Sequence, residues 1–359
     1  MSRINKTKAI KIGVLLLGIT LLTAGILSGL LFINTSNSDG YWVSISPELV
    51  GMDSYILDNM IYDVESNNYG VYSILVIRNG YIVKEWYARF FHKDYLFRLF
   101  SVSKSITSAL IGIAFDKGYI NSLNQTVLDF FPDKDIANLD PRKESITIEH
   151  LLTMTTGLDW PEYFPYDDPR NPYFDWIASE DYVEYVLNRT MVATPGQEFN
   201  YNTGATHLLT AILERVSNMS TIDFANQYLF DPLRIYDYYL LQDPQGVACG
   251  GDGLFLKPRD MAKIGYLFFK NGTWEGTQII SESWVNTSTS SRVNLGINHS
   301  YGYQWWIYPN DSCYKALGYG GQVISVYYEL NLIVVFTGME HDFDYPSFLI
   351  DSYILPSII

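Results

Sequence analysis

One short segment combines a hydroxyl nucleophile with a nearby base. It reads Ser101-Val102-Ser103-Lys104 and comes directly before a run of residues with helical periodicity. At a helix start, Ser101 and Lys104 lie one turn apart on the same face. Backbone N–H groups at this helix end favour a developing anion, and a desolvated Lys loses its proton more easily, so that it can activate the hydroxyl. The segment indicates acyl transfer through a serine, although Ser101 or Ser103 could instead be only a helix N-cap.

Two further segments carry groups that such chemistry needs. In PGQEFNYNTG (195–204), Tyr201 lies in a loop, where it could share a proton with a lysine; the alternative is a Tyr packed on a turn. In GYGGQ (318–322), the glycines let a substrate approach the backbone and leave N–H groups for an oxyanion. The alternative for that segment is a bulge or a tight entry into an edge strand.

Other hydrolytic and metal chemistries find no support in the sequence. There is no GxSxG elbow, and none of the five histidines sits in a motif with an acid. His150 and His207 lie within helical apolar runs and are expected to pack or to cap. No CxxC, HExxH or His/Cys cluster occurs, so no metal and no cofactor is predicted. Cys249 and Cys313 are compatible with one disulfide or with two free, buried thiols.

Charge separates the N-terminus from the rest of the chain. The net charge is −15, which disfavours binding to nucleic acid, yet Arg3, Lys6, Lys8 and Lys11 precede an uncharged apolar run over residues 12–33. A membrane-spanning helix needs about 20 apolar residues, whereas a cleaved signal has an apolar core of about 7–15. Because basic residues stay on the cytoplasmic side, we expect a single-pass anchor in the lipid bilayer, with the remaining chain outside the cytoplasm.

Strand signals occur on both sides of a helical middle. Residues 69–87 hold two β-rich runs around Asn79-Gly80, the strongest short hairpin signal. Residues from 301 onward return to strand character, with a short turn at 329–331. Between them, a helix is predicted to begin near Ser101 to Ser103, and residues from about 120 to 245 look mostly helical and loop-like.

This order of elements predicts an α+β fold: an antiparallel sheet flanked by helices, with an inserted, mainly helical region. The chain has 359 residues, enough for one large domain. The expected parts, in order, are a basic cytoplasmic tail (1–11), a transmembrane anchor (12–33), a polar linker (34–45) and a hydrolase domain (46–359).

The chain resembles the serine β-lactamase-like family of class C β-lactamases, D,D-carboxypeptidases, family VIII esterases and 6-aminohexanoate-dimer hydrolases. The matching segments, in the family's order, are FSVSKSITSALIG, ITIEHLLTMTTGLDW, VATPGQEFNYNTGATHLL, GGDGLFLKPRDMAKIGYLF, YGYQWW and GYGGQVISVYYELNLIVVFTG. LLTMTTGLDW and PGQEFNYNTG are quite specific, and the match is closest to the esterase and 6-aminohexanoate-dimer hydrolase side. The resemblance implies a β-lactamase/transpeptidase-like fold.

The resemblance also carries site residues over. It implies that Ser101 is the nucleophile, Lys104 its activator and Tyr201 the general base and acid, without a cofactor. The oxyanion would bind the N–H groups of Ser101 and of either Gly318 or Tyr319.

Two family triplets are altered. Thr203 replaces the Asn of the family's Tyr-x-Asn triplet, which puts its contact with the acyl side chain in doubt. Lys315-Ala316-Leu317 occupies the place of the family's Lys/His-Thr/Ser-Gly triplet.

We therefore expect a membrane-anchored serine hydrolase that cleaves a small ester or amide. The alternatives are β-lactamase or D,D-carboxypeptidase activity, and a non-catalytic binding module on the same fold. A binding module would be expected to lose Ser101, Lys104 or Tyr201, and all three are present.

Overall fold

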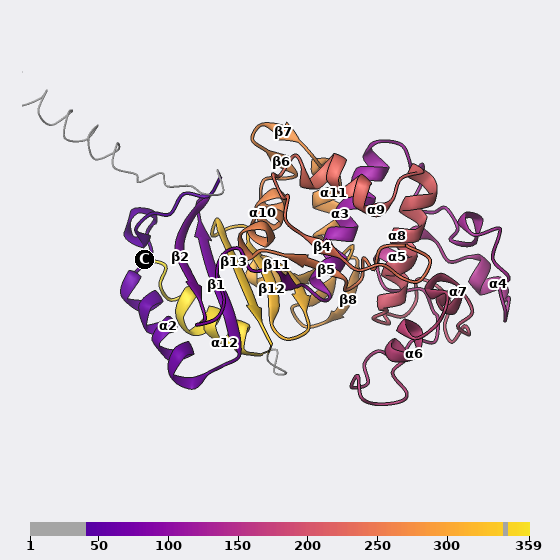
Figure 1. Cartoon of the computed structure of the whole chain (residues 1–359), viewed down its shortest axis with the longest axis horizontal. Helices are drawn as coiled ribbons and strands as arrows, with labels where there is room; N and C mark the ends of the chain where they lie inside the picture. Colours follow the sequence, from indigo (N-terminus) through magenta and orange to yellow (C-terminus); the bar gives the residue numbers. More distant parts are fainter. Residues whose placement is uncertain (1–40, 340–343) are drawn as a thin grey trace, which may run out of the picture. The chain divides into compact units, whose positions relative to one another are not determined.

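An eight-stranded antiparallel sheet runs through the computed structural model, in the strand order β2-β1-β13-β12-β11-β10-β9-β8 (Figure 1). The strands are β1 (Val71–Arg78), β2 (Tyr81–Tyr87), β8 (Val293–Gly296), β9 (His299–Tyr301), β10 (Trp306–Tyr308), β11 (Cys313–Gly318), β12 (Gln322–Tyr327) and β13 (Leu332–Gly338). β1 pairs with β13, so that Ile74 lies opposite Phe336. Early and late segments of the chain thus complete one sheet, which confirms the predicted α+β arrangement.

Both predicted hairpins are present. Asn79 and Gly80 join β1 to β2, and both have positive φ angles, 52° and 85°, as a two-residue hairpin turn of this kind requires. β12 and β13 are joined by residues 328–331, where Asn331 has a φ of 50°.

Helices cover the sheet. α10 (Pro258–Phe269) contacts β1, β12 and β13, and Figure 1 shows α2 (Ser54–Asn67) and α12 (Asp344–Leu349) on the other side of β1. The C-terminal segment η5 (Ile350–Ile354) packs on α2.

The inserted helical region lies on the side of the sheet that ends in β8, away from β1 and β2 (Figure 1). Its helices are α4 (Pro141–Glu144), α5 (Ile148–Leu152), α6 (Tyr173–Ile177), α7 (Tyr182–Leu187), α8 (Thr203–Ser217) and α9 (Thr221–Ala225). A further helix, α11 (Glu282–Ser288), follows α10 in the chain.

Helix α3 (Val102–Asp116) begins where the sequence predicts and lies between the sheet and the helical region. It contacts β11 and β12 on one side and α8 on the other. For that reason every residue from 102 to 114 is buried, including polar ones. A helix with two packed sides places its first turn in the interface, where side chains from both regions meet.

A small sheet supports the start of α3. It has the order β3-β5-β4, from β3 (Phe97–Arg98), β4 (Tyr239–Leu240) and β5 (Leu254–Leu256). A two-stranded ribbon, β6 (Thr273–Trp274) with β7 (Thr277–Gln278), lies elsewhere. The pairing of Phe97 with Leu256 brings two short strands that are far apart in the chain together beside α3, and no local sequence pattern predicted this pairing.

The structure describes residues 41–339 and 344–359, and the chain divides into one unit that ends at Ile45 and another from Ser46 to Ile359. The predicted tail and anchor, and most of the linker, lie outside the described residues. In the part that is described, no helix has the length and apolar character needed to cross a bilayer. Cys249 and Cys313 are free and buried, so the thiol alternative holds.

Candidate active site

The backbone is strained immediately before the candidate nucleophile. Phe100 has a φ of 47°, in the left-handed region that a non-glycine residue rarely adopts. Its ring is held between the guanidinium of Arg98, 4.7 Å away, and the ring of Tyr319, 5.5 Å away. The turn presents Ser101 at the entrance of α3. The Ser101 side chain makes no capping hydrogen bond, and the hydroxyl of Ser103 instead accepts the Leu254 N–H at 3.2 Å. Ser101 is therefore not a simple N-cap.

Lys104 lies one turn further and is 1% exposed. Its Nζ donates to the Oγ of Ser101 at 3.0 Å, to the Oγ1 of Thr203 at 2.9 Å and to the carbonyl oxygen of Gly251 at 2.9 Å. Burial lowers the pKa of Lys104 to about 8, against the opposing charges of Glu162 and Asp252. A substantial fraction of this lysine is thus neutral under mildly alkaline conditions, as a general base must be.

Tyr201 approaches the same two groups from the loop before α8. Its ring lies under Lys104, with the Nζ 4.8 Å from the ring centre, and it stacks on Trp306 at 5.8 Å. Burial and the charge of Glu162 raise the pKa of Tyr201 well above its usual value, while a hydrogen bond with Ser101 acts in the opposite direction. Its phenol therefore stays protonated and can pass a proton on. The structure brings Ser101, Lys104 and Tyr201 together.

The third residue of the altered triplet turns inward. The hydroxyl of Thr203, besides accepting from Lys104, donates to Oε1 of Glu162 at 2.5 Å. The Thr203 N–H donates to Oε2 of the same carboxylate at 2.7 Å. Asn202 caps α8 by accepting the Ala205 N–H, so the backbone here is fixed by the helix start.

The end of β11 lies against the start of α3. A Cβ added to Gly318 would come within 2.3 Å of the carbonyl oxygen of Leu99 and 3.2 Å of the Val102 nitrogen. Only glycine allows this approach. Gly318 and Tyr319 therefore both lie beside Ser101, and both line a cavity that includes it. Which of their N–H groups would bind an oxyanion with that of Ser101 stays a prediction.

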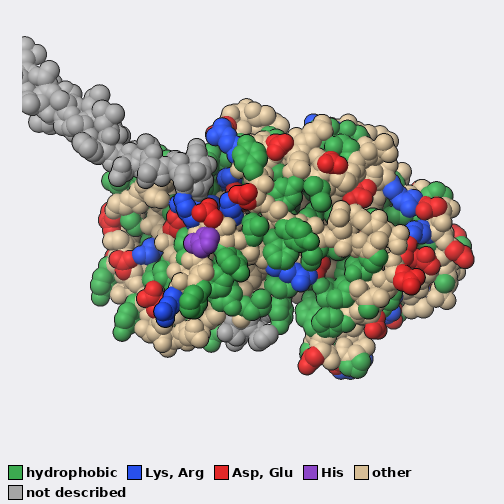
Figure 2. Space-filling view, in the orientation of Figure 1, with side chains coloured by type: hydrophobic (Ala, Val, Ile, Leu, Met, Phe, Trp, Pro, Cys, Tyr) green, Lys and Arg blue, Asp and Glu red, His purple; other side chains and the backbone are tan. Residues whose placement is uncertain are grey.

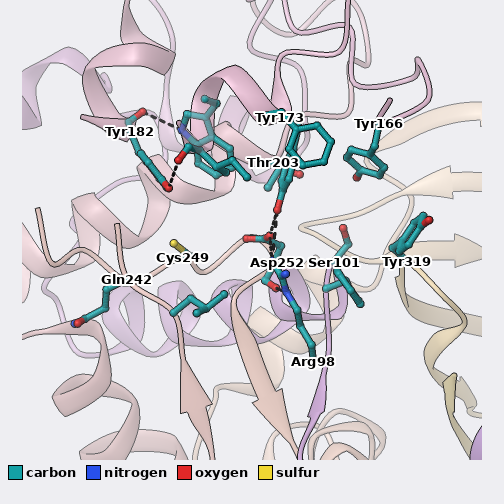
Figure 3. Close-up of a pocket in the computed structure, with 15 residues that line it drawn as sticks. Arg98, Ser101, Tyr166, Tyr173, Tyr182, Thr203, Gln242, Cys249, Asp252 and Tyr319 are labelled. Carbon is teal, nitrogen blue, oxygen red and sulfur yellow. Dashed lines mark hydrogen bonds and ion pairs between the residues drawn. The ribbon is translucent and has the colours of Figure 1, made fainter. Parts of the chain in front are cut away.

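Two cavities meet at Ser101. The first has a volume of about 450 Å³ and lies towards α6 and α7 (Figure 3). It is lined mainly by aromatic side chains: Phe100, Tyr166, Tyr173, Phe174, Trp176, Tyr182 and Tyr319. The second, about 880 Å³, includes Tyr201, Trp306 and Leu317 and is bordered by the loop of residues 162–167. Figure 2 shows hydrophobic side chains gathered on the visible face where the sheet meets the helical region.

An ion pair lies within the first cavity. Nη2 of Arg98 is 2.6 Å from Oδ2 of Asp252, and the Tyr173 hydroxyl also donates to that oxygen (Figure 3). The positive charge of Arg98 is therefore already neutralised. Cys249 borders the same cavity, and burial raises the pKa of its thiol to about 12, so it stays protonated.

Lys315 does not reach either cavity. Its Nζ lies 4.8 Å from the ring centre of Tyr308 and 5.9 Å from that of Tyr327, and neither cavity lining includes it. Lys315, the cation at the place of the family's Lys/His-Thr/Ser-Gly triplet, is thus turned away from Ser101.

His150 and His207 pack or cap, as the sequence suggested. The His150 side chain completes a capping box with Thr147 at the start of α5. His207 is fully buried and its Nε2 lies 2.9 Å from Oδ2 of Asp243, an acid 36 positions away. Neither His150 nor His207 lines a cavity beside Ser101.

Sequence reasoning missed several groups at the site. Glu162 lies two positions after the end of the specific LLTMTTGLDW segment, and Asp252 lies within the quoted GGDGLFL segment. Motif membership could have signalled Asp252 and proximity to a motif Glu162, because nothing local distinguishes these acids from solvated ones. The contribution of the Gly251 carbonyl to Lys104 is a backbone contact, and composition carries no trace of it.

Comparisons with known proteins bear on the family and the fold of the chain. The model of the Beta-lactamase family matches residues 63–340. A 6-aminohexanoate-dimer hydrolase from Paenarthrobacter ureafaciens is 25% identical over 260 residues, which cover 67% of this chain and 64% of that protein. The chain thus spans less than two thirds of that relative.

Solved structures share the fold. EstCE1, described as a hydrolase with promiscuous acyltransferase activity, superposes with a TM-score of 0.70 at 17% identity, covering 84% of this chain and 98% of that one. An octameric penicillin-binding protein homologue from Pyrococcus abyssi gives a TM-score of 0.63 at 20% identity, covering 84% of this chain and 76% of that one. At such identities the likeness concerns the fold.

Proposed function

Since this chain belongs to the Beta-lactamase family and is a serine hydrolase, we propose that it cleaves neutral esters or amides through an acyl-enzyme on Ser101. Lys104 acts as the base and Tyr201 carries the proton to the leaving group. The observation that carries this proposal is the 3.0 Å contact between the Nζ of a buried Lys104 and the Oγ of Ser101.

The reaction proceeds in two balanced halves. Ser101 Oγ attacks the carbonyl carbon while its proton passes to Lys104, and the carbonyl π electrons move to the oxygen. The oxyanion binds the Ser101 N–H and that of Gly318 or Tyr319. When the tetrahedral intermediate collapses, Tyr201 protonates the departing oxygen or nitrogen and regains a proton from Lys104. Tyr201 and Lys104 then take a proton from water as the water oxygen attacks the acyl carbon. The bond between Ser101 Oγ and the acyl carbon breaks, Oγ regains that proton, and the carboxylic acid leaves.

The two cavities give the substrate a direction. Tyr201 lines the second cavity and not the first. Because the proton donor must contact the leaving group, the leaving group occupies the second cavity and the acyl group the aromatic first cavity. An apolar or aromatic acyl group of modest size matches its volume of about 450 Å³ and its ring-lined walls.

Neutral substrates match the electrostatics. Among the described residues that line the two cavities, Arg98 is the only Lys or Arg, and Asp252 neutralises it. Ala316 provides no hydroxyl, and Lys315 lies over Tyr308. A substrate carboxylate would therefore meet the acids Glu162 and Asp167 without a free cation. A missing charge-assisted hydrogen bond lowers transition-state binding by about 1.5–3 kcal/mol.

The test uses the soluble domain from about residue 38. A fluorophosphonate should label Ser101, as located by mass spectrometry, and Ser101→Ala should abolish both labelling and turnover while the fold persists. An adduct on Ser103, or undiminished activity in the variant, would contradict the assignment.

In the same preparation, p-nitrophenyl butyrate should give a higher kcat/KM than nitrocefin or a D-Ala-D-Ala peptide. Efficient nitrocefin hydrolysis with negligible esterase activity would instead assign β-lactamase function.

We further propose that residues 12–33 anchor the hydrolase in a membrane, with the catalytic domain outside the cytoplasm. The uncharged run and the four preceding cations support this orientation. Protease added to intact cells should cut near residues 34–40 and release an active fragment. Protection in intact cells with cleavage after lysis would reverse the orientation, and a mature N-terminus near residue 35 would identify a cleaved signal.

A further inference from the structure

The three hydrogen-bond partners of Lys104 are not equivalent. The Gly251 carbonyl oxygen, 2.9 Å from Nζ, can only accept a hydrogen bond. The hydroxyls of Ser101 and Thr203 could each donate or accept, because a hydroxyl rotates to suit its surroundings. Loss of a proton from Lys104 leaves a lone pair on Nζ, but it does not by itself determine where that lone pair points. That direction depends on which of the two hydroxyls is prevented from donating to it.

Glu162 fixes the hydroxyl of Thr203. Its carboxylate is 8% exposed and accepts four donors. Oε2 accepts the Thr203 N–H and the Trp160 Nε1–H, both at 2.7 Å, and Oε1 accepts the Thr203 hydroxyl at 2.5 Å and the Tyr166 hydroxyl at 3.2 Å. At Oε1, the Thr203 hydroxyl is the donor and the carboxylate oxygen is the acceptor. The Thr203 proton therefore lies on the Glu162 side, and the lone pair of Thr203 Oγ1 faces Lys104.

This arrangement leaves one orientation for the neutral amine. An –NH₂ group has two N–H bonds and one lone pair. Two of the three partners, the Gly251 carbonyl and Thr203 Oγ1, can only accept from it and so take both N–H bonds. The lone pair then points at Ser101 Oγ, 3.0 Å away.

From this geometry we infer that Glu162 and Thr203 are positioning residues, which orient the hydrogens of Lys104 so that its lone pair faces the Ser101 hydroxyl. Thr203 acts through its hydrogen bond with Lys104, and Glu162 acts through Thr203. The inference rests on the proposed roles of Ser101 and Lys104. It also assigns a role to Thr203, the altered residue of the Tyr-x-Asn triplet. The Thr203 hydroxyl can orient Lys104 only because the buried Glu162 carboxylate keeps it as an acceptor towards Nζ.

Two substitutions disturb this arrangement in different ways. Thr203→Val keeps the shape of the side chain but removes the hydroxyl, so that one N–H of Lys104 loses its acceptor. Glu162→Gln keeps the shape but places an amide N–H₂ opposite Thr203 Oγ1, because the remaining carbonyl oxygen is needed by the Thr203 N–H. That amide donates to Oγ1, the hydroxyl reverses, and its proton competes with Ser101 for the lone pair.

Charge adds a second readout for Glu162→Gln. The charged groups that act on Lys104 are Glu162 and Asp252, and Asp252 is paired with Arg98. The neighbouring phenol, Tyr201, stays protonated. Loss of the Glu162 charge removes one of the two influences that raise the pKa of Lys104, so the alkaline rise in rate moves to lower pH. A purely structural role would lower the active fraction and leave that midpoint unmoved.

The experiment measures kcat, KM and the rate constant for fluorophosphonate labelling of Ser101, each against pH, in the purified full-length chain. Thr203→Val should lower kcat and labelling by about 10²-fold or more, the size of a general-base contribution, with KM changed far less. Thr203→Ser, which restores the hydroxyl, should recover most of the rate. Glu162→Gln should lower the rate at its pH plateau and shift the midpoint downward. The double variant should be little worse than Thr203→Val, because both act through one hydroxyl.

The matched control is Glu149→Gln. Glu149 also accepts two charged or phenolic donors, from Arg292 and Tyr303, but lines neither cavity. It should change thermal stability without moving the pH midpoint. The inference is overturned if folded Thr203→Val keeps kcat within about threefold of wild type, or, should that variant not fold, if Glu162→Gln matches wild type in plateau rate and midpoint. A wild-type protein without labelling at Ser101 would instead refute the proposed function.

Discussion

Arg98 and Asp252 form an ion pair inside the aromatic cavity beside Ser101, with Nη2 2.6 Å from Oδ2. The cavity therefore contains a cation that is unavailable to substrate. Asp252 is 7% exposed and also accepts the Tyr173 hydroxyl, so the pair is held on two sides.

The first prediction follows from that pair. Asp252→Asn releases the charge of Arg98 to the cavity, and an acyl group that ends in a carboxylate should then bind better relative to a neutral one. We expect the ratio of kcat/KM for mono-p-nitrophenyl succinate to that for p-nitrophenyl butyrate to rise about tenfold, as for one added charge-assisted hydrogen bond. Steady-state kinetics on both esters measure it.

The control replaces another buried acid. Asp260 pairs with Lys263 at 2.7 Å and lines neither cavity. Asp260→Asn should leave the ratio unchanged. An unchanged ratio in Asp252→Asn as well would show that the acyl group does not reach Arg98.

The second prediction concerns pH. The base form of Lys104 is its neutral amine, and burial lowers the pKa of Lys104 to about 8. The rate constant kcat/KM should therefore be low at acid pH, rise as the ammonium loses its proton near pH 8, and level off above it. Because burial raises the pKa of Tyr201, loss of its proton does not cut the plateau short.

A pH profile of kcat/KM on a neutral ester between pH 6 and 10, with thermal unfolding followed in the same buffers, measures this rise. A midpoint below pH 6.5, or a rate that falls with pH in the folded protein, would contradict a neutral lysine as the base.

The third prediction tests whether the proton relay is one unit. Lys104→Ala and Tyr201→Phe should each remove most of the rate, about 10²–10⁴-fold for one acid–base group. The double variant should lose little more than either single one, because groups that act together are not additive. Multiplicative losses would show two independent roles. Tyr303→Phe offers a matched control, since Tyr303 is a buried phenol that binds Glu149 and lines neither cavity.

Much of this architecture was predictable because it is written in local patterns. Alternation and Asn79-Gly80 determine the first hairpin, and Ser101 with Lys104 needs only the period of a helix. Tyr201 and Gly318 entered through motif order, since a loop tyrosine or a glycine has no spacing that links it to Ser101. The contacts with Glu162 and Asp252 arise from packing between segments more than 50 positions apart along the chain from Lys104, and only the folded chain brings them together.

Thr203, in the altered Tyr-x-Asn triplet, also shows that contacts between distant segments cannot be read from the local sequence. In the sequence, Thr203 in place of Asn put the contact with the acyl group in doubt. In the structure the residue instead serves Lys104, since its hydroxyl lies between that amine and Glu162. The role of Thr203 depends on its spatial neighbours Lys104 and Glu162, and neither of them is adjacent to it in the sequence.

The last prediction concerns the meeting of β11 with α3. A Cβ at Gly318 would lie 2.3 Å from the carbonyl oxygen of Leu99, a backbone atom that cannot rotate away. Gly318→Ala must therefore push the end of β11 from the start of α3 and displace the N–H groups of Gly318 and Tyr319 from Ser101. We expect kcat, calculated on the concentration of enzyme whose Ser101 the fluorophosphonate can label, to fall by about 10²–10³-fold, as when an oxyanion donor is lost. The free energy of unfolding should also fall by about 1–3 kcal/mol, because the added Cβ overpacks this contact.

A second glycine separates these two effects. A Cβ at Gly265 in α10 would lie 2.8 Å from Cγ2 of Ile324, so Gly265→Ala also crowds the core but on α10 against β12, and Gly265 lines neither cavity. It should lower the melting temperature while kcat per labelled Ser101 stays near wild type. If folded Gly318→Ala keeps the wild-type kcat, the oxyanion is not held at the end of β11. If both variants lose kcat in proportion to their stability, the loss at Gly318 reflects unfolding rather than a displaced donor.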